Sequence, residues 1–409
     1  MHFRPYYLSA ASAIALFATA GLGQAADTTP GSNANVSSKG AAAAIPSGQS
    51  LSAAGGLSQQ AVAKLLANTE PYPTPQLSVL PQEARALIDP FAASGDAAPA
   101  ISPGNVGLKT TQGSTVAEPT ISASDAVGGG ITPFDYGRNN LATVYHYTDR
   151  LLDTELNDDY PYRTVGWFRF VAANGGSYRC TAQLISRSVG VTAGHCVHSE
   201  GGTKAAGWIK SATFTPAYAN GAAPYGSAEV SWVNTTSGWY NTGALDAGYD
   251  VGIFVLKKRI GTSTELGAYT GYSSFCYSNC LQKYWYLTQL GYPGNYYSGA
   301  YMTEGEHLEV SDTRDYLYGS GMQGGSSGGG HFANLGDLAS YTAGSLGNWP
   351  YRNTVFATTS WGYTDATLKI QGASSLSGPN NANNFKALFN GACNKSRSLH
   401  GTASCSLLP

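Results

Sequence analysis

The stretch Thr192-Ala193-Gly194-His195-Cys196 sets the interpretation of the whole chain. On its own, a histidine beside a cysteine indicates no more than a packed ring next to a disulfide. Three later stretches follow it: Asp250 before the apolar residues 251–256, then Gly-Ser-Ser-Gly-Gly-Gly at residues 325–330, and finally Ser-Trp-Gly at residues 360–362. Each has an ordinary structural explanation when taken alone, whereas the ordered set of four points to a catalytic site.

The bulk composition narrows the classes of function. The 409 residues carry a net charge of −2, and only 12% of them are charged. Such a chain has no basic block and no acidic tail, so no nucleic-acid partner is expected. The many glycines and tyrosines, together with seven tryptophans, are typical of a compact extracellular β protein.

The first 25 residues have the pattern of a secretory signal peptide. Arg4 lies near the start, an apolar run covers residues 8–22, and small residues follow as far as Ala26. The run is short for a membrane span, so a membrane anchor is the weaker alternative. We predict cleavage near Ala25 or Ala26 and a secreted protein, extracellular or periplasmic, with no membrane partner after signal removal.

The six cysteines fit an oxidising compartment. Six cysteines allow fifteen pairings. Spacing favours three pairs: Cys180 with Cys196, Cys276 with Cys280, and Cys393 with Cys405. The second pair could instead bind a metal ion, but no histidine lies nearby to complete a tetrahedral set. We therefore expect neither a metal nor another cofactor.

Residues 26–130 differ in composition from the rest. They are rich in Ala, Ser, Gly, Pro and Thr, contain no Cys or Trp, and have only Tyr72 and Phe91 as aromatics. Such a segment buries too little apolar surface to offset its ordering entropy. Two short helices are predicted inside it, at residues 58–68 and 81–88. We interpret the segment as a propeptide removed during maturation, or else as a retained flexible linker.

Aromatic density rises after residue 130, and all seven tryptophans lie beyond residue 160. Short runs of β-branched and aromatic residues, separated by glycine-rich turns, predict strands. The expected strands are residues 165–171, 178–185, 189–191, 208–214, 228–233, 251–256, 284–290, 306–310 and 354–360, with a helix at 383–389. Many short strands without a clear repeat period indicate an all-β barrel protein.

The order His, Asp, Gly-x-Ser-Gly-Gly, Ser-Trp-Gly resembles the chymotrypsin-like (trypsin-fold) serine endopeptidases. The resemblance covers about residues 162–389, and the turn at residues 291–294 is similar to one in bacterial secreted glutamyl endopeptidase-like members. It implies an all-β fold of two packed six-stranded antiparallel barrels with the active site between them, to which the sequence adds a short C-terminal helix. It also implies a protease domain over residues 131–409, a Cys180–Cys196 disulfide beside the histidine, and a monomer that acts on protein or peptide substrates.

The catalytic residues that the resemblance implies are His195, Asp250 and Ser327. A serine hydroxyl is a weak nucleophile at neutral pH and needs an adjacent imidazole to take its proton. A buried carboxylate at the other ring nitrogen fixes the tautomer and stabilises the cation that forms. Asp250 suits this role because it stands at the entry to a buried strand, where a charge is costly without a partner; Asp246, in a polar loop, is the weaker choice. Ser326 is the alternative nucleophile, but the Gly-x-Ser-Gly-Gly frame favours Ser327.

The glycine-rich run around Ser327 has its own physical reason. Two backbone N–H groups must point at one oxygen to stabilise the developing oxyanion, and residues without a Cβ allow that tight turn. The resemblance assigns these donors to Gly325 and Ser327. Animal members carry an aspartate just before the nucleophile, where it pairs with the newly cut N-terminus, and this chain has Ser326 in that place.

Substrate-binding residues are implied at Gly321, Met322, Ser360, Trp361 and Gly362. In the family, the Ser-Trp-Gly segment pairs with the extended substrate backbone by strand addition; a plain core strand with a buried tryptophan is the alternative. Gly321 stands six residues before the nucleophile, at the floor of the specificity pocket, with Met322 at the next wall position. An acidic floor would select Lys or Arg, so trypsin-like preference is not expected.

Glutamate selectivity is not supported either. Glutamate-selective relatives use a histidine beside the Trp-Gly pair, where this chain has Thr359 and Ser360, although hydroxyls could still hydrogen-bond a carboxylate. Two other classes stay open: a catalytically inactive protease-fold binding module, and a cell-surface adhesive protein suggested by the Ala/Gly/Ser-rich front. The intact set of His195, Asp250 and Ser327 favours a secreted serine endopeptidase over both.

Overall fold

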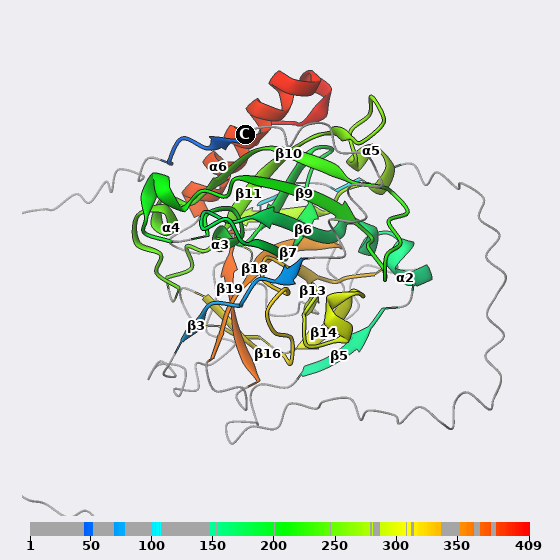
Figure 1. Ribbon diagram of the computed structural model, residues 1–409, viewed down its shortest axis with the longest axis vertical. Coiled ribbons are helices and arrows are strands. Elements are labelled where there is room, and N and C mark those ends of the chain that lie inside the picture. Colours follow the sequence, from blue (N-terminus) through cyan, green and yellow to red (C-terminus); the bar gives the residue numbers. More distant parts are fainter. Residues whose placement is uncertain are drawn as a thin grey trace, which may run out of the picture. The chain divides into compact units, whose positions relative to one another are not determined.

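Short strands separated by glycine-rich turns carry the fold, as the sequence indicates (Figure 1). The computed structural model describes residues 45–51, 69–77, 100–102, 104–105, 107, 147–152, 154–199, 201–245, 247–278, 280, 287–307, 309–311, 315–336, 352–363, 369–377 and 382–409. All of them belong to one unit that extends from Ala42 to Pro409. The predicted signal peptide, the helices predicted at residues 58–68 and 81–88, and Asp246 lie outside the described residues.

Six strands close into an antiparallel barrel. They are β6 (Val165–Val171), β7 (Ser177–Leu184), β8 (Val189–Thr192), β9 (Ser211–Pro216), β10 (Ala228–Thr235) and β11 (Gly252–Arg259). The order β10-β11-β8-β7-β6-β9 returns to its start because β9 also pairs with β10. Phenylalanine rings fill the interior, where the Phe254 centroid lies 4.9 Å from that of Phe168 and 5.6 Å from that of Phe214. Gly190 leaves room for them, since a Cβ there would lie 2.1 Å from the Phe254 ring.

A second sheet stands beside the barrel (Figure 1). Its main strands are β5 (Tyr147–Leu151), β12 (Ser274–Ser278), β13 (Leu287–Gly291), β14 (Thr303–His307), β15 (Glu309–Ser311), β16 (Asp315–Gly319), β17 (Gly330–Ala333), β18 (Thr354–Tyr363) and β19 (Ile370–Ser375). Their order is β15-β16-β19-β18-β17-β13-β14-β5, with β12 beside β18. Over the described residues this sheet is a half-barrel, because its two end strands, β15 and β5, do not pair with each other. β5 forms backbone hydrogen bonds with the outer edge of β14. The predicted all-β chymotrypsin-like class is confirmed, with one barrel closed and the other open.

In the described part of the chain, helices are short except at the C-terminus. The short ones are α2 (Thr154–Asp158), α3 (Gly194–Val197), α4 (Ser237–Thr242) and α5 (Gly267–Thr270). The C-terminal helix α6 (Ala382–His400) includes the predicted residues 383–389 and continues beyond them. Its apolar side chains Phe385, Leu388 and Phe389 are buried in the core, so burial of this face fixes the helix on the barrel.

The six cysteines form three disulfides: Cys180–Cys196, Cys276–Cys280 and Cys393–Cys405. These are the pairs that spacing favoured. The first bond joins β7 to α3 and so fastens the turn that carries His195 to the barrel. Because their sulfur atoms are joined, Cys276 and Cys280 offer no thiolates to a metal ion.

Parts of the N-terminal region add short strands to both sheets. β1 (Gln49–Ser50) pairs with β10, β2 (Glu70–Pro71) with β7, β3 (Gln76–Leu77) with β18, and β4 (Ala100–Ser102) with β12. The composition of residues 26–130 predicts too little apolar surface for independent order. Strand addition needs little apolar surface, because the exposed edge of a sheet supplies backbone hydrogen bonds. Composition alone does not reveal that kind of order.

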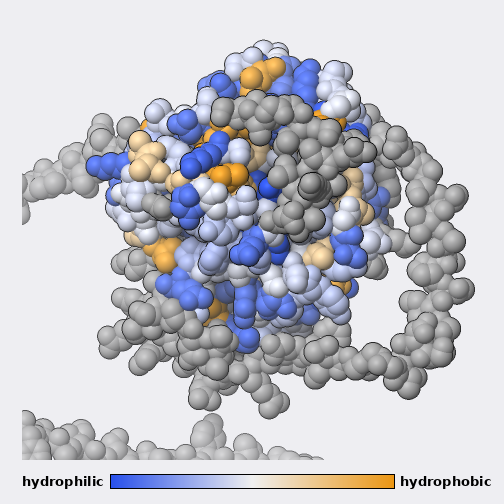
Figure 2. Space-filling model, in the orientation of Figure 1, coloured by the Kyte–Doolittle hydropathy of each residue, from blue (hydrophilic) through white to orange (hydrophobic). Residues whose placement is uncertain are grey.

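The face shown in Figure 2 is mostly hydrophilic over the described residues, with apolar residues scattered across it. The large apolar side chains that are exposed in the described part of the chain are Leu151, Tyr297, Leu399 and Leu407. Scattered apolar residues are ordinary for a protein surface. Among the helices that can be described, none is both long and apolar enough to cross a bilayer.

Candidate active site

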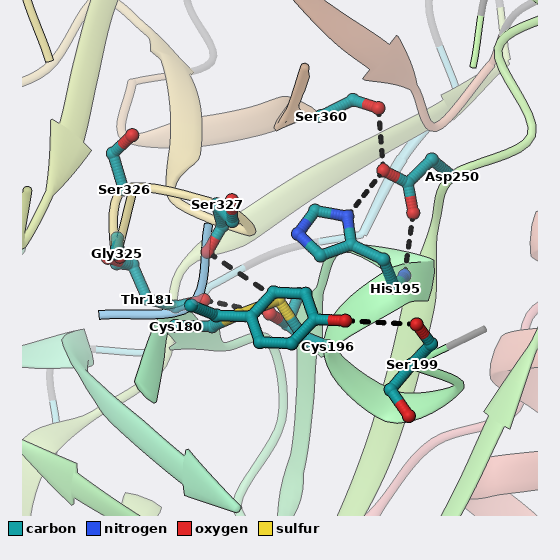
Figure 3. Close-up of a disulfide and its surroundings, with 12 residues drawn as sticks. Cys180, Thr181, His195, Cys196, Ser199, Asp250, Gly325, Ser326, Ser327 and Ser360 are labelled. Carbon is teal, nitrogen blue, oxygen red and sulfur yellow. Dashed lines mark hydrogen bonds and ion pairs between the residues drawn. A yellow bond between two sulfur atoms is a disulfide. The ribbon is translucent and has the colours of Figure 1, made fainter. Parts of the chain in front are cut away.

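Three residues that the sequence singles out meet at the ends of different elements. His195 lies on α3, just after β8; Asp250 precedes β11; and Ser327 lies in the turn that leads into β17. Because β8 and β11 are paired neighbours, the adjacent ends of these strands bring His195 and Asp250 together. Figure 3 shows the His195 ring between Asp250 and Ser327.

Asp250 holds the histidine at two points. Its Oδ2 lies 2.7 Å from His195 Nδ1, and its Oδ1 accepts a hydrogen bond from the His195 backbone N–H at 2.7 Å. The Ser360 hydroxyl donates to the same Oδ2 at 2.6 Å. All three side chains are buried. The carboxylate therefore fixes the orientation of the ring and places the proton on Nδ1, which leaves Nε2 as an acceptor.

Ser327 presents its hydroxyl to that acceptor side. The Ser327 Oγ and the His195 Nε2 are both buried, and neither has a hydrogen-bond partner among the described residues. In Figure 3 the Nε2 edge of the ring faces Ser327. Neighbouring Ser326 is engaged elsewhere, since its Oγ donates to the Gln323 carbonyl at 2.7 Å. The geometry thus offers Ser327, and not Ser326, to the imidazole.

Gly325 has a backbone conformation that is specific to glycine. Its φ of +97° is a left-handed conformation, and a Cβ there would lie 2.6 Å from the Tyr292 carbonyl, so only glycine fits. Thr181 fixes the loop from behind: its hydroxyl donates to the Gly325 carbonyl at 2.8 Å, and its N–H donates to the Ser327 carbonyl at 2.8 Å. Sequence reasoning missed this supporting residue, which follows Cys180 directly in the chain.

The residues expected to bind substrate fall into two groups. Gly321, Met322 and Gly362 line one pocket next to the Ser327 turn. Trp361 is buried, with its ring against Gly372, and belongs to the core. Ser360, expected beside the substrate backbone, directs its hydroxyl to the Asp250 carboxylate instead, a contact that the sequence does not indicate.

Asp149 is a second residue that sequence reasoning missed. It comes from β5, far from the turn in sequence, and is buried. Its Oδ2 accepts from the Gly321 backbone N–H at 2.9 Å and from the Tyr296 hydroxyl at 3.0 Å. A Cβ at Gly321 would lie 2.8 Å from this carboxylate oxygen. Gly321, the expected floor of the specificity pocket, is therefore in direct contact with the carboxylate of Asp149 from β5.

A buried polar cluster lies behind the pocket wall. Thr359 Oγ1 contacts His331 Nε2 at 3.1 Å and accepts from Gln289 Nε2 at 2.9 Å. The His307 ring lies 5.2 Å from that of His331. Burial lowers the pKa of His307 to about 4, and burial together with the neighbouring His307 lowers the pKa of His331 well below its usual value. Both rings are therefore neutral in the folded chain at pH 7.

The folded chain is expected to lose stability as the pH falls below about 6.5. A histidine with a lowered folded-state pKa binds its proton more readily after unfolding, so acid favours the unfolded state until the pH passes below the folded pKa. For His307, the free energy of unfolding should drop by about 2 kcal/mol between pH 7 and pH 5. Urea unfolding at a series of pH values between 7 and 5 measures this. His307→Gln should flatten the dependence, and an equal slope in both proteins would contradict neutral burial.

The described residues offer one group of possible metal ligands in the cleft. Cys180, His195 and Cys196 place their ligand atoms within 4.8 Å of one another. Both sulfur atoms belong to the disulfide, so neither is a thiolate. This donor set does not fit a metal ion.

Comparison with known proteins gives two curated relatives, both proteases by name. The chain is 28% identical over 169 residues to glutamyl endopeptidase of Bacillus licheniformis, which is 41% of this chain and 48% of that protein. It is 29% identical over 160 residues to extracellular metalloprotease of Bacillus subtilis, or 38% of this chain and 48% of that protein. The chain thus spans about half the length of the curated relatives it matches. No family model matches the sequence.

Solved structures of proteases also resemble the chain. Protease Anisep from Arthrobacter nicotinovorans is 23% identical, with 53% of this chain and 90% of that chain covered and a TM-score of 0.41. The thermostable serine protease AL20 from an extremophilic microorganism is 23% identical, with 59% of this chain and 97% of that chain covered and a TM-score of 0.43. Glu endopeptidase in complex with MPD is 21% identical, with 59% of this chain and 94% of that chain covered and a TM-score of 0.44.

The closed barrel, the second sheet and the site between them agree with the resemblance drawn from the motifs. The first curated relative, a glutamyl endopeptidase by name, is in line with the bacterial members that the motifs resemble. The chain is therefore similar to bacterial glutamyl endopeptidase and has the fold of the chymotrypsin-like serine endopeptidases.

Proposed function

We propose that this chain is a secreted serine endopeptidase that hydrolyses peptide bonds through an acyl-enzyme. The observation that carries the proposal is the buried line of groups from Asp250 through His195 to the Ser327 hydroxyl, which has no hydrogen-bond partner in the part of the chain that the structure describes. A buried polar atom without a partner is costly, and such groups gather where a reacting molecule supplies the missing contact. The curated relatives, both proteases by name, support the same class of reaction.

In the proposed reaction, Ser327 Oγ attacks the carbonyl carbon of the scissile bond while His195 Nε2 takes the hydroxyl proton. Asp250 stabilises the imidazolium through Nδ1, and the N–H groups of Gly325 and Ser327 receive the carbonyl oxygen as it becomes negative. The C–N bond then breaks, His195 returns its proton to the leaving amine, and the acyl group stays on Ser327. Water deprotonated by the same ring hydrolyses the ester and restores the serine.

The substrate side of the proposal uses the pocket beside the Ser327 turn. Gly321, Met322 and Gly362 would bind the side chain that precedes the scissile bond, next to the edge of β18. The name of the first relative refers to glutamate, but the Thr359 hydroxyl already contacts His331 and Gln289. We therefore propose no preference for glutamate.

Secretion and maturation are part of the proposal. Residues 1–25 would be the signal peptide, residues 26–130 a propeptide, and residues 131–409 the protease domain. Three disulfides suit an oxidising compartment. The change in composition predicts a mature N-terminus between residues 118 and 162. Because β5 supplies the Asp149 contact beneath Gly321, we narrow this range: the mature chain should keep that strand and begin between residue 118 and Tyr147.

A metal-dependent protease is the second candidate, because the second relative is named a metalloprotease. The disulfide-bonded ligand group described above does not favour it. Catalytically inactive or adhesive roles would leave Ser327 unreactive.

Labelling of the mature protein with a serine-reactive fluorophosphonate separates these classes. We expect one labelled site, which Ser327→Ala removes and Ser326→Ala keeps, and casein hydrolysis that survives a chelator. Hydrolysis that is lost with the chelator, without labelling, would support the metal-dependent candidate. Absence of both labelling and hydrolysis would support a binding or adhesive role.

A further inference from the structure

Nine residues from the N-terminal region cross the candidate active site. They are residues 69–77, Thr-Glu-Pro-Tyr-Pro-Thr-Pro-Gln-Leu, called here the cleft segment. At one end, β2 pairs with β7, with Glu70 opposite Tyr178 and Pro71 opposite Arg179. At the other end, β3 pairs with β18, with Gln76 opposite Gly362. The segment therefore joins the closed barrel to the second sheet along the line of the cleft.

Tyr72 covers the catalytic candidates. Its ring stacks on the His195 ring, with 5.5 Å between centroids and 19° between planes. Its hydroxyl donates to the Ser199 carbonyl at 2.9 Å. Its carbonyl accepts from the Gly325 N–H at 2.9 Å. One residue thus occupies the space over the proposed base and takes a proposed oxyanion donor.

The rest of the cleft segment fills the substrate side. Pro73 and Thr74 line the same pocket as Gly321, and the Pro75 carbonyl accepts from the Gly362 N–H at 2.9 Å. Bare glycine backbone lies beneath the segment, because a Cβ at Gly324 would lie 2.8 Å from the Tyr72 carbonyl oxygen. A peptide substrate that needs this pocket and the edge of β18 cannot bind while the segment is there.

The direction of the cleft segment is opposite to that of a substrate. With the pocket and β18 on the acyl side, as the proposed function has it, the N-terminal half of a substrate lies at β18 and its C-terminal half at β7. The cleft segment has residues 70–71 at β7 and residues 76–77 at β18, and both pairings are parallel. Cleavage of the Tyr72–Pro73 bond would require His195 to give a proton to the leaving nitrogen of Pro73. In the reversed segment that nitrogen lies on the pocket side of the bond, where the acyl part of a substrate would lie. Cleavage of that bond is therefore disfavoured.

The sequence of the cleft segment suits tight binding to the cleft, although the segment has no hydrophobic core of its own. Pro71, Pro73 and Pro75 alternate, and proline already has the φ of an extended chain and has no N–H to satisfy. Ordering such a chain costs less entropy than ordering an ordinary loop. The buried guanidinium of Arg179 also donates to the Thr69 carbonyl, which anchors the start of the segment.

We propose that the cleft segment is an inhibitory peptide bound in reverse across the substrate cleft, and that the cleft is a binding site for extended proline-rich peptides of this sequence. The proposal rests on the proposed protease function. Cleavage between residue 118 and Tyr147 does not by itself empty the cleft, because β2 and β3 hold the segment by hydrogen bonds to the two sheets. Release requires that the segment dissociate or be degraded.

The direct test uses mature protein that has been separated from the cleaved N-terminal region, and adds a synthetic peptide of residues 69–77 during hydrolysis of a small fluorogenic peptide. We expect competitive inhibition, with KM raised and kcat unchanged, and a peptide that stays intact by mass spectrometry. A peptide with Tyr72→Ala should bind more weakly, with an inhibition constant raised about 10-fold or more. A peptide of the same residues in reversed order should lack this competitive inhibition. Equal inhibition by all three peptides, or rapid cleavage of the first, would overturn the proposal.

A second test uses the full chain. Fluorophosphonate labelling of the unprocessed band should be slow, and Tyr72→Ala should speed it about 10-fold or more. Gln49→Ala, on the exposed β1 strand of the same region, is the matched control and should leave the rate unchanged. If the mature protein is active and the fluorophosphonate labels the unprocessed chain as fast as it labels the mature protein, the inhibition proposal is wrong and the protease proposal stands. If neither form reacts or hydrolyses substrate, both are wrong.

Discussion

Replacing Ser327 with alanine is expected to lower kcat by about 10⁶, if the site behaves as other serine–histidine sites do. The Oγ that faces His195 Nε2 is the only proposed nucleophile, and its loss leaves only substrate binding and the oxyanion donors. His195→Ala should cost about as much, because the serine then has no base. The double variant should be little worse than either single one, since residues that act as a unit are not additive.

The measurement is kcat and kcat/KM on a peptide substrate, with each variant cut to the same mature N-terminus. Ser326→Ala is the matched control, because Ser326 is the adjacent serine and bonds the Gln323 carbonyl outside the proposed reaction. It should keep most of the activity. Wild-type activity in Ser327→Ala, or a folded but inactive Ser326→Ala, would show that the nucleophile is assigned wrongly.

The second large effect is expected for Asp250→Asn, with a loss of about 10⁴ in kcat. The Asp250 carboxylate accepts from the Nδ1–H and the backbone N–H of His195, and from the Ser360 hydroxyl. An asparagine has one acceptor oxygen where the carboxylate has two, and its NH₂ group would favour the wrong tautomer of the ring. The base would then present a proton, in place of a lone pair, to Ser327.

Ser360→Ala tests how much the orientation of the Asp250 carboxylate contributes, apart from its charge. It removes one of the three hydrogen bonds to Asp250 and keeps the carboxylate, so the loss should be about 10- to 100-fold. Kinetics of both variants, with circular dichroism as a check of folding, give the comparison. A folded Asp250→Asn protein within 10-fold of wild type would rule out Asp250 as the residue that orients the base.

Local sequence patterns predicted the class of fold, and the family resemblance that they carry supplied the candidate residues of the site. Residues 251–256 are apolar on both faces, which is the pattern of a buried strand, and residues 252–256 form the first part of β11. The Gly-x-Ser-Gly-Gly frame singled out Ser327 because a tight turn needs glycine, and Gly325 indeed has a positive φ. Cysteine spacing indicated three disulfides that the structure contains. These features are local, so neighbours in the chain are enough to reveal them.

Other groups at the candidate site come from distant parts of the chain, and folding brings them together. Asp149 reaches Gly321 across 172 positions of sequence, and the Ser360 hydroxyl reaches Asp250 across 110. The composition of residues 26–130 predicted a region without order, yet Tyr72 stacks on His195 and its carbonyl takes the Gly325 N–H. The edge of β14 is likewise covered by β5, a strand that lies about 150 residues earlier in the chain. A sheet edge accepts any extended backbone that can reach it, so the choice of partner is written in the geometry of the folded chain and not in local residue patterns.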